Sequence, residues 1–314
     1  MDNVCHTLVG LAVARAGLNT QTRLATATLA IAANLPDVDV LVFATGIPSV
    51  AIRRGWTHGV LAQAVLPVAF AGLMLWVGRV KTGGLRPAPA NFSWLLVLSY
   101  IGVLSHVGLD YLNTYGVRLL MPFSNQWFYG DSVFIVDIWM WLLLGAGVLL
   151  ARNGRTWFSR LGIVLTSIYV VAMVISAGAA RTIVLERWTE TMGAAPARLM
   201  VGPVPINPFR KSMIVDAGDR YVLGRFSWAP RGIAFNPRDI PKNNDSPWIE
   251  IARRENPDFD YILIWSRFPY WEISDDESGT RVTLKDARFP QGLRGFSATT
   301  YIRKAVASRR RAGH

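Results

Sequence analysis

The chain has 314 residues, of which 51% are hydrophobic and only 17% are charged, and its mean hydropathy is +0.27. Because soluble proteins carry about 25% charged residues, this composition argues against an entirely soluble protein and indicates membrane segments. The net charge of +12 suits membrane topology and anionic lipid headgroups, so membrane lipid is an expected partner and nucleic acid is not. Cys5 is the only cysteine, which excludes an intramolecular disulfide and a thiolate metal cluster.

Apolar segments fill the first part of the chain. Two come first, at residues 7–18 and 24–34, and both are shorter than the roughly 20 residues that a full membrane span requires. Four longer runs predict spanning helices, at residues 60–80, 92–112, 134–151 and 161–180. The sequence therefore predicts a polytopic helical membrane domain over residues 1–185.

The composition changes after Arg181, where proline, asparagine, aspartate and arginine become frequent and long apolar runs end. A short helix is expected at residues 246–254, after Ser246-Pro247, and a basic tail at residues 305–314. The fold class expected is thus mainly α, with a β-rich (α+β) soluble domain at residues 195–304. Its strands are expected at residues 213–215, 220–228, 261–265 and 281–284.

Basic residues in short loops set the orientation of membrane helices. They cluster in three turns of this chain, which we therefore expect on the cytoplasmic side of the membrane: Arg15 and Arg23; Arg79, Lys81 and Arg86; and Arg152, Arg155 and Arg160. By parity, the C-terminal domain is expected to be extracytoplasmic. Histidines and aspartates gather at the opposite ends of the apolar segments, where Arg53 and Arg54 break the charge pattern.

His106 and Asp110 are four residues apart, so on a helix they share one face. An imidazole and a carboxylate in this arrangement are suitable metal ligands. The other candidates at the same ends of the apolar segments are His6, Asp37, Asp39, His58, Asp131 and Asp137. Their shared side in the predicted topology leads us to expect a metal site there.

Imidazole with carboxylate favours one or two divalent ions, with zinc preferred and manganese or iron as alternatives. Asp37 and Asp39 are two residues apart, so one carboxylate can bind metal while the other orients a histidine. A basic pair on the acidic side calls for another role, and a substrate anion at Arg54 is one such role.

Four motifs occur in a fixed order, CHTL at residues 5–8, LPDVD at 35–39, RGWTHG at 54–59 and LSHVGLD at 104–110. Together they resemble the bacterial inner-membrane metal-dependent hydrolases of the YdjM/YbcI type, over about residues 1 to 180. NTYG, MPFS and IVD, which follow within residues 113–137, resemble one branch of that family. The order of the motifs is also distantly similar to zinc-dependent phospholipase C, which uses additional histidines for a third ion.

The preferred interpretation is a membrane-bound hydrolase of a phosphoester or lipid-like substrate at the outer membrane–water interface. Asp39 or Asp131 would be the general base or orient a ligand, and Arg54 would meet the phosphate. A non-catalytic metal-binding regulatory protein, whose C-terminal domain recognises a partner, stays open as the alternative. Transport is disfavoured because transport sites lie near the midplane. The expected metal ligands are His6, Asp37, His58, His106, Asp110 and Asp137.

Overall fold

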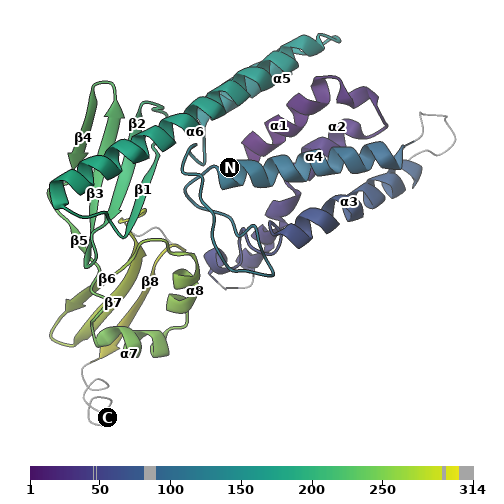
Figure 1. Ribbon diagram of the computed structural model, residues 1–314. Coiled ribbons are helices and arrows are strands. Elements are labelled where there is room, and N and C mark those ends of the chain that lie inside the picture. The colour runs from purple at the N-terminus through teal and green to yellow at the C-terminus, as the bar shows by residue number, and fades with distance from the viewer. Residues whose placement is uncertain (45, 47, 81–89, 292–294, 304–314) are drawn as a thin grey trace. The chain divides into compact units, whose positions relative to one another are not determined.

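The structure is a computed structural model that describes residues 1–44, 46, 48–80, 90–291 and 295–303 (Figure 1). The helices are α1 (Asn3–Arg15), α2 (Ala25–Ala32), α3 (Val60–Val80), α4 (Phe92–Tyr111), α5 (Ile138–Leu150), α6 (Thr156–Met192), α7 (Trp248–Glu255) and α8 (Asp258–Trp265). The 3₁₀ helices of the described residues are η1 (Leu18–Thr20), η2 (Leu35–Ala44) and η3 (Ser49–Ala51). The strands are β1 (Arg198–Pro203), β2 (Arg210–Asp216), β3 (Arg220–Trp228), β4 (Arg231–Phe235), β5 (Ile240–Pro241), β6 (Pro269–Asp275), β7 (Gly279–Asp286) and β8 (Ala298–Arg303).

Among the described residues, α3, α4 and α6 are long and apolar enough to cross a membrane, and α2 with η2, bent by 51°, could form one further span. The expected class, a helical membrane domain followed by a β-rich region, is confirmed. The helix α5 is shorter than the apolar run at residues 134–151 predicts. Asp137 caps it, because its side chain accepts hydrogen bonds from the backbone N–H groups of Trp139 and Met140.

The chain forms two compact units. The first contains Met1–Asp39, Arg54–Ala180 and Gly202–Lys211. The second contains Val40–Arg53, Arg181–Val201 and the chain from Ser212 onward. The loop between Asp39 and Arg54 therefore belongs to the C-terminal unit, although the residues at both of its ends belong to the helical unit.

Two glycines let α1 and α4 approach α2 closely. A Cβ atom built on Gly10 would lie 2.6 Å from the Leu29 carbonyl oxygen, and one on Gly102 would lie 2.5 Å from the Ala32 Cβ atom. Small residues at helix contacts allow this close packing in membranes. As a result, α2 lies against α1, which carries His6 near its N-terminal end, and against α4, which carries His106 near its C-terminal end.

Arginines gather at the other end of these helices and donate to carbonyl groups near helix C-termini. The Arg160 Nε atom is 2.8 Å from the Ala16 oxygen, and the Arg23 Nη1 atom is 3.2 Å from the Gly78 oxygen. Arg15 donates to the Val148 oxygen. These bonds satisfy carbonyls that lack a partner within their own helix. Of the other expected basic residues, Lys81, Arg86 and the tail at 305–314 lie outside the described residues.

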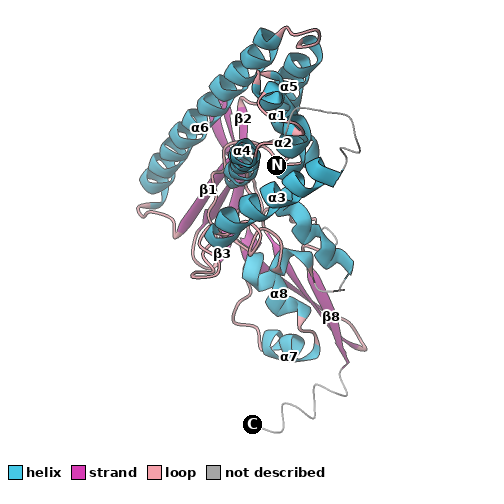
Figure 2. Ribbon diagram, turned by 90° about the vertical axis from the view of Figure 1, so that its right-hand side faces the viewer, coloured by secondary structure: helices cyan, strands magenta, loops and turns pink. Residues whose placement is uncertain are grey.

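Among the described residues, the strands that follow α6 form two antiparallel sheets, which are magenta in Figure 2. In the larger sheet the order is β1-β2-β3-β4, with β5 also paired to β3, and in the smaller it is β6-β7-β8. Trp271 of β6 pairs with Leu284 of β7, and Val282 of β7 pairs with Thr300 of β8. The expected strands at 213–215, 220–228 and 281–284 lie within β2, β3 and β7.

The strand expected at residues 261–265 is wrong, because this segment forms the end of α8. Its β-branched and aromatic residues suggested a strand. However, Phe259, Ile262 and Trp265 are all buried, and their spacing of three is that of one helix face. Pro257 precedes the helix, and Asp258 lies in its first turn, where proline and acidic side chains favour a helix start.

Candidate metal centre

The site begins with the last turns of α4. His106 and Asp110 lie on one face of this helix, and both side chains are fully buried. The His106 Nε2 atom is 3.6 Å from the Asp110 Oδ2 atom. A buried carboxylate is costly unless a cation or a hydrogen bond compensates its charge, so this face requires partners.

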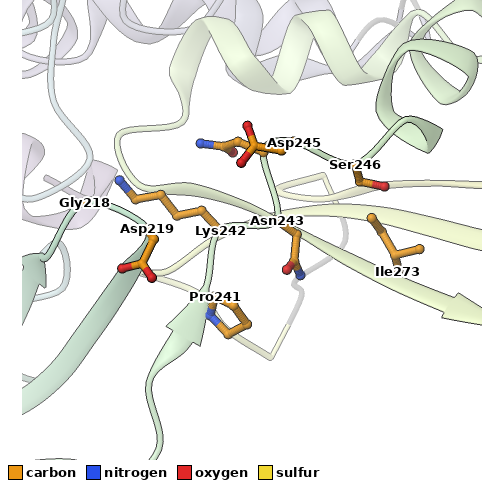
Figure 3. A pocket seen from close by; sticks show the side chains of 9 residues that line it. Gly218, Asp219, Pro241, Lys242, Asn243, Asp245, Ser246 and Ile273 are labelled. Atoms are coloured by element: carbon orange, nitrogen blue, oxygen red, sulfur yellow. The ribbon is translucent and has the colours of Figure 1, made fainter.

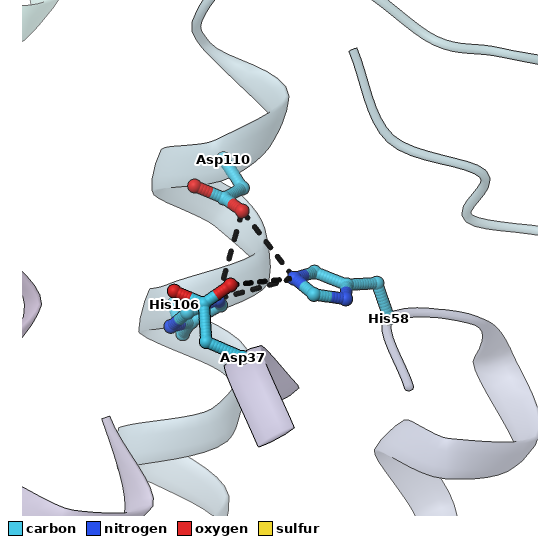
Figure 4. A group of neighbouring side chains, drawn as sticks. All are labelled: Asp37, His58, His106 and Asp110. Atoms are coloured by element: carbon cyan, nitrogen blue, oxygen red, sulfur yellow. Dashed lines mark hydrogen bonds and ion pairs between the residues drawn. The ribbon is translucent and has the colours of Figure 1, made fainter. Parts of the chain in front are cut away.

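Two further elements complete a group of four (Figure 4). Asp37 comes from η2, and His58 comes from the segment just before α3. Each of the four side chains offers one ligand atom, and these atoms all lie within 4.8 Å of one another. A buried group of Asp37, His58, His106 and Asp110 could therefore hold a metal ion.

The spacing of the ligand atoms suits a tetrahedral ion. At metal–ligand distances of 2.0–2.2 Å, tetrahedral ligand atoms lie ~3.3–3.6 Å apart. The His58 Nε2 atom is 3.1 Å from the His106 Nε2 atom and 3.3 Å from the Asp110 Oδ2 atom. The Asp37 Oδ1 atom is more distant, at 4.0 Å from His58 Nε2 and 3.9 Å from His106 Nε2. Three ligand atoms thus form a tight set, and Asp37 faces it.

The outer nitrogens of both histidines are engaged elsewhere. The His106 Nδ1 atom is 2.7 Å from the Ala33 carbonyl oxygen, which can only accept, so Nδ1 carries the proton. The His58 Nδ1 atom is 2.9 Å from the Thr57 Oγ1 atom and 3.5 Å from the Asp39 Oδ2 atom. Such partners fix the tautomer of metal-binding histidines. Burial also lowers the pKa of His58, which favours the neutral imidazole that binds metal.

His6 lies beside the group. Its ring stacks on that of His106 with centroids 3.8 Å apart, and its Nε2 atom is 3.3 Å from the Asp110 Oδ1 atom. In the described part of the chain, neither ring nitrogen of His6 has a hydrogen-bond partner, and the residue is fully buried. Unpaired buried polar atoms are costly, and a metal ion would supply the missing partner.

Arg54 brings a positive charge to the same place. Its Nε atom is 2.9 Å from the Asp110 Oδ2 atom, and its Nη2 atom is 3.0 Å from Asp110 Oδ1. The Nη1 atom is 2.9 Å from the Asn113 Oδ1 atom, and the guanidinium lies 4.6 Å from the centroid of the Tyr115 ring. The amino nitrogen of Met1 also donates to Asp110. The Arg54 guanidinium thus compensates the charge of this buried carboxylate.

The backbone at Arg54 is held in an uncommon conformation. Its φ of 54° lies in the left-handed region, which costs energy for a residue with a side chain. Two bonds hold it: its N–H donates to Asp39 Oδ2 at 2.8 Å, and its carbonyl accepts from the Arg118 N–H at 2.9 Å. Strained residues of this kind cluster at functional sites.

Besides His6, Asp39 and Arg54, two further expected site residues lie outside the four-residue group. Asp137 caps α5, and its Oδ2 atom accepts a hydrogen bond from the Tyr169 hydroxyl at 2.8 Å. Asp131 lies in the loop between α4 and α5, in a turn where its φ is 49°. The apolar run that follows both residues suggested a membrane end rich in ligands, but an aspartate just before a helix is also a common cap.

Three supporting groups were not anticipated from the sequence. They are the hydroxyl of Thr57, the amide of Asn113 and the carbonyl of Ala33. Thr57 and Asn113 stand within or just after motifs that carry the ligands, so their position was a usable signal. The Ala33 carbonyl had none, because a backbone partner is set by how α2 packs on α4.

The C-terminal unit has a polar cavity of about 770 Å³ (Figure 3). Lys242 in its wall is paired with Asp216 at 2.6 Å, and Asn243 donates to the Trp271 carbonyl at 2.7 Å. Its lining contains no histidine. The residues that line this cavity therefore offer a metal ion no imidazole, whereas the group in the helical unit offers two.

The fold and the site together define a helical membrane protein with a buried histidine–aspartate group that could hold a metal ion. The family model described as YdjM inner membrane protein matches residues 1–180. The chain therefore belongs to the YdjM inner membrane protein family. No curated protein and no solved structure matches it.

Proposed function

We propose that this chain is a metal-dependent hydrolase of the inner membrane that cleaves a phosphoester in a lipid-like substrate. The observation that carries the proposal is the buried set of His58, His106 and Asp110, with Asp37 facing it at 3.9–4.0 Å from the two imidazoles. Two histidines and one carboxylate with a further position left for water are typical of catalytic zinc sites. The distant similarity to zinc-dependent phospholipase C points to the same chemistry.

In this proposal, different residues bind the metal ion, activate water and bind the phosphate. His58, His106 and Asp110 would hold the ion, and zinc suits imidazole with carboxylate. When bound, such an ion lowers the pKa of a water molecule to near 7 and polarises a phosphoryl oxygen. Asp37 would accept the proton of that water. Arg54, beside Asp110, would neutralise the phosphate.

Asp39 takes a positioning role in this proposal. Its Oδ2 atom faces the Nδ1 side of His58, away from the ligand atoms, and it also accepts from the Thr57 hydroxyl at 3.1 Å. It orients His58 and holds the backbone of Arg54. The general base expected from the sequence at Asp39 or Asp131 is therefore proposed at Asp37.

The predicted membrane topology indicates the side of the membrane on which the centre lies and the class of substrate available there. Short basic turns would face the cytoplasm, so the centre and the C-terminal unit would be extracytoplasmic. Membrane lipid is then the nearest source of a phosphoester.

One observation favours the alternative, a non-catalytic metal-binding regulatory protein. Four side chains surround the centre, and closed sets of four protein ligands are typical of structural zinc sites. In that case the C-terminal unit would recognise a partner. The two functions differ in what Asp37 does.

The test compares wild-type protein, Asp37→Asn and His106→Ala in detergent. We expect His106→Ala to lose the metal, measured by elemental analysis. We expect Asp37→Asn to keep it and to hydrolyse phosphodiester, phosphomonoester and phospholipid probes about 10²–10⁴-fold more slowly, the usual effect of removing a general base. A wild-type protein that holds metal but cleaves none of these probes would overturn the hydrolase and support the regulatory protein.

A further inference from the structure

An apolar groove of about 370 Å³ lies within the helical unit, between α1, α4, α5 and α6. Its wall on α4 includes Ser105, Gly108 and Leu109, which alternate in sequence with the ligands His106 and Asp110. Its wall on α1 includes Val9 and Val13, below His6 on that helix. The groove therefore borders α4, which carries His106 and Asp110, and α1, which carries His6 beside them.

Two of the three hydroxyl groups in the wall are bonded to carbonyl groups of their own helices. The Ser105 Oγ atom donates to the Gly102 carbonyl at 2.8 Å, and the Thr166 Oγ1 atom donates to the Gly162 carbonyl at 2.8 Å. Each serves its own helix, so Ser105 and Thr166 offer an occupant no donor, and the exposed Ser167 is the remaining hydroxyl of the wall. With valine, leucine, isoleucine and methionine making up most of the remaining wall, the groove suits a hydrocarbon.

The groove is closed at the end that carries the arginines. There α5 and α6 are in close contact, because a Cβ atom on Gly147 would lie 3.2 Å from the Gly162 Cα atom. The Ser159 hydroxyl also donates to the Ala12 carbonyl at 2.8 Å, which joins α6 to α1. These contacts close one end of the groove, so the headgroup of a chain lying along it is expected at the end where His6 and Asp110 lie.

We propose that this groove holds one acyl chain of a membrane lipid and so presents the headgroup of that lipid at the level of the metal centre. Both α4 and α6 are membrane-spanning candidates, so acyl chains are what the groove meets in the bilayer. That the bound lipid is also the substrate rests on the proposed hydrolase. The groove would then select substrates that carry a long acyl chain.

Gly108 provides the test, because it lines the groove and a Cβ atom there would meet nothing within 4 Å. Gly108→Leu fills the groove. Gly145→Leu is the matched control, since Gly145 on α5 also has open space around its Cβ position but does not line the groove. Val171→Phe, on the exposed part of the wall, is a second blocking variant remote from the metal ligands.

The probe is phosphatidylglycerol with a diazirine in one acyl chain, in vesicles of phosphatidylethanolamine and phosphatidylglycerol. We expect photolabelling to concentrate on residues 105–109 and 140–144, in wild type and in His106→Ala alike. Both blocking variants should lower it about tenfold, a loss of ~1.4 kcal/mol that overpacking can cause, and Gly145→Leu should not. Uniform labelling of all lipid-facing helices, or labelling unchanged by both blocking variants, would overturn the groove.

Hydrolysis separates the two proposals. Labelling in the groove by a wild-type protein that cleaves nothing would sink the hydrolase and leave the acyl-chain site standing. Equal cleavage of short-chain and long-chain phosphoesters by wild type and Gly108→Leu would overturn the acyl-chain site and leave the hydrolase standing. Metal content of Gly108→Leu, compared with that of Gly145→Leu, shows that the centre two residues away is intact.

Discussion

Arg54 and Asp110 form a buried ion pair at the centre, so the charge of Asp110 can be compensated by Arg54, by a bound metal ion or by both. In the structure, the guanidinium contacts both carboxylate oxygens of Asp110. A divalent ion at the centre would share this carboxylate and supply the same compensation. Loss of the arginine therefore matters most when no metal is bound.

We expect Arg54→Gln to destabilise the metal-free protein by ~3–5 kcal/mol, the usual cost of leaving a buried charge unpaired. Saturating zinc should recover a large part of this loss. The measurement is the unfolding temperature in detergent with zinc and with chelator. Arg53→Gln is the control, because Arg53 lies over the Phe43 ring in the other unit. Equal destabilisation in both conditions would show that Asp110 does not bind the ion.

At the scale of helices, the contact of α2 with α4 sets the orientation of His106. Gly102 stands one turn before this histidine, and the Ala33 carbonyl that fixes the imidazole comes from the end of α2. The distance between α2 and α4 therefore affects the orientation of the His106 imidazole through its hydrogen bond to the Ala33 carbonyl.

Gly102→Ala should therefore weaken metal binding without changing a ligand. The new Cβ atom would lie 2.5 Å from Ala32 and 2.8 Å from the Ala33 nitrogen, so the helices must separate. Overpacking costs ~1–3 kcal/mol, and disturbed support of a ligand typically lowers metal affinity about 10–100-fold. Competition with a zinc chelator measures this affinity. Gly72→Ala on α3, where the Cβ atom meets nothing within 4 Å, should bind zinc as wild type does.

On the scale of the whole molecule, the loop at residues 40–53 joins the two units. It packs with the C-terminal unit, where η3 contacts α8, yet it begins after Asp39 and ends before Arg54. Both residues support the centre. The C-terminal unit is thus connected through the chain to the positions that orient His58 and Asp110.

Orientation in the membrane is tested by labelling single cysteines in a Cys5→Ser background. Cysteine at Asn153, an exposed residue of the basic turn before α6, should resist an impermeant reagent in intact spheroplasts. Cysteine at Glu277, exposed between β6 and β7, should react. The physical reason is the preference of basic loops for the cytoplasm. Reaction at Asn153 with protection at Glu277 would place the centre on the cytoplasmic side.

The stability of the C-terminal unit should fall in acid because of Asp286. Burial alone would raise the pKa of this carboxyl, but the guanidinium of Arg288 and hydrogen bonds from Arg288 and Ser266 lower it. A depressed pKa contributes stability above the unfolded value of about 3.9, and this is lost as the pH falls through the folded pKa.

Asp286→Asn should accordingly unfold the C-terminal unit at lower temperature at pH 7 and flatten the pH dependence below pH ~4. Tryptophan fluorescence can follow it, because Trp265 lies 4.1 Å from the Arg288 guanidinium. Asp245→Asn, at an exposed position of the same unit, is the comparison. An unchanged acid profile in Asp286→Asn would contradict this account.

The longer apolar runs by themselves determined the class of this protein, because those at residues 60–80, 92–112 and 161–180 are long and continuous enough to show a membrane helix without knowledge of their neighbours. The spacing of His106 and Asp110 likewise determined that they share a helix face. These are local properties, as is the gathering of histidines and aspartates at one end of each run. The helical period in residues 258–265 was also present, but β-branched residues obscured it.

Only the tertiary structure decided which of those acids meet. Asp37 and Asp137 both stand at the end of an apolar run, yet Asp37 faces the histidines and Asp137 caps α5. The pairing of Arg54 with Asp110 and the groove beside Gly108 depend on helix packing between segments distant in sequence. Packing depends on close contacts such as that of Gly102 with Ala32, and such contacts leave no periodic pattern in the chain.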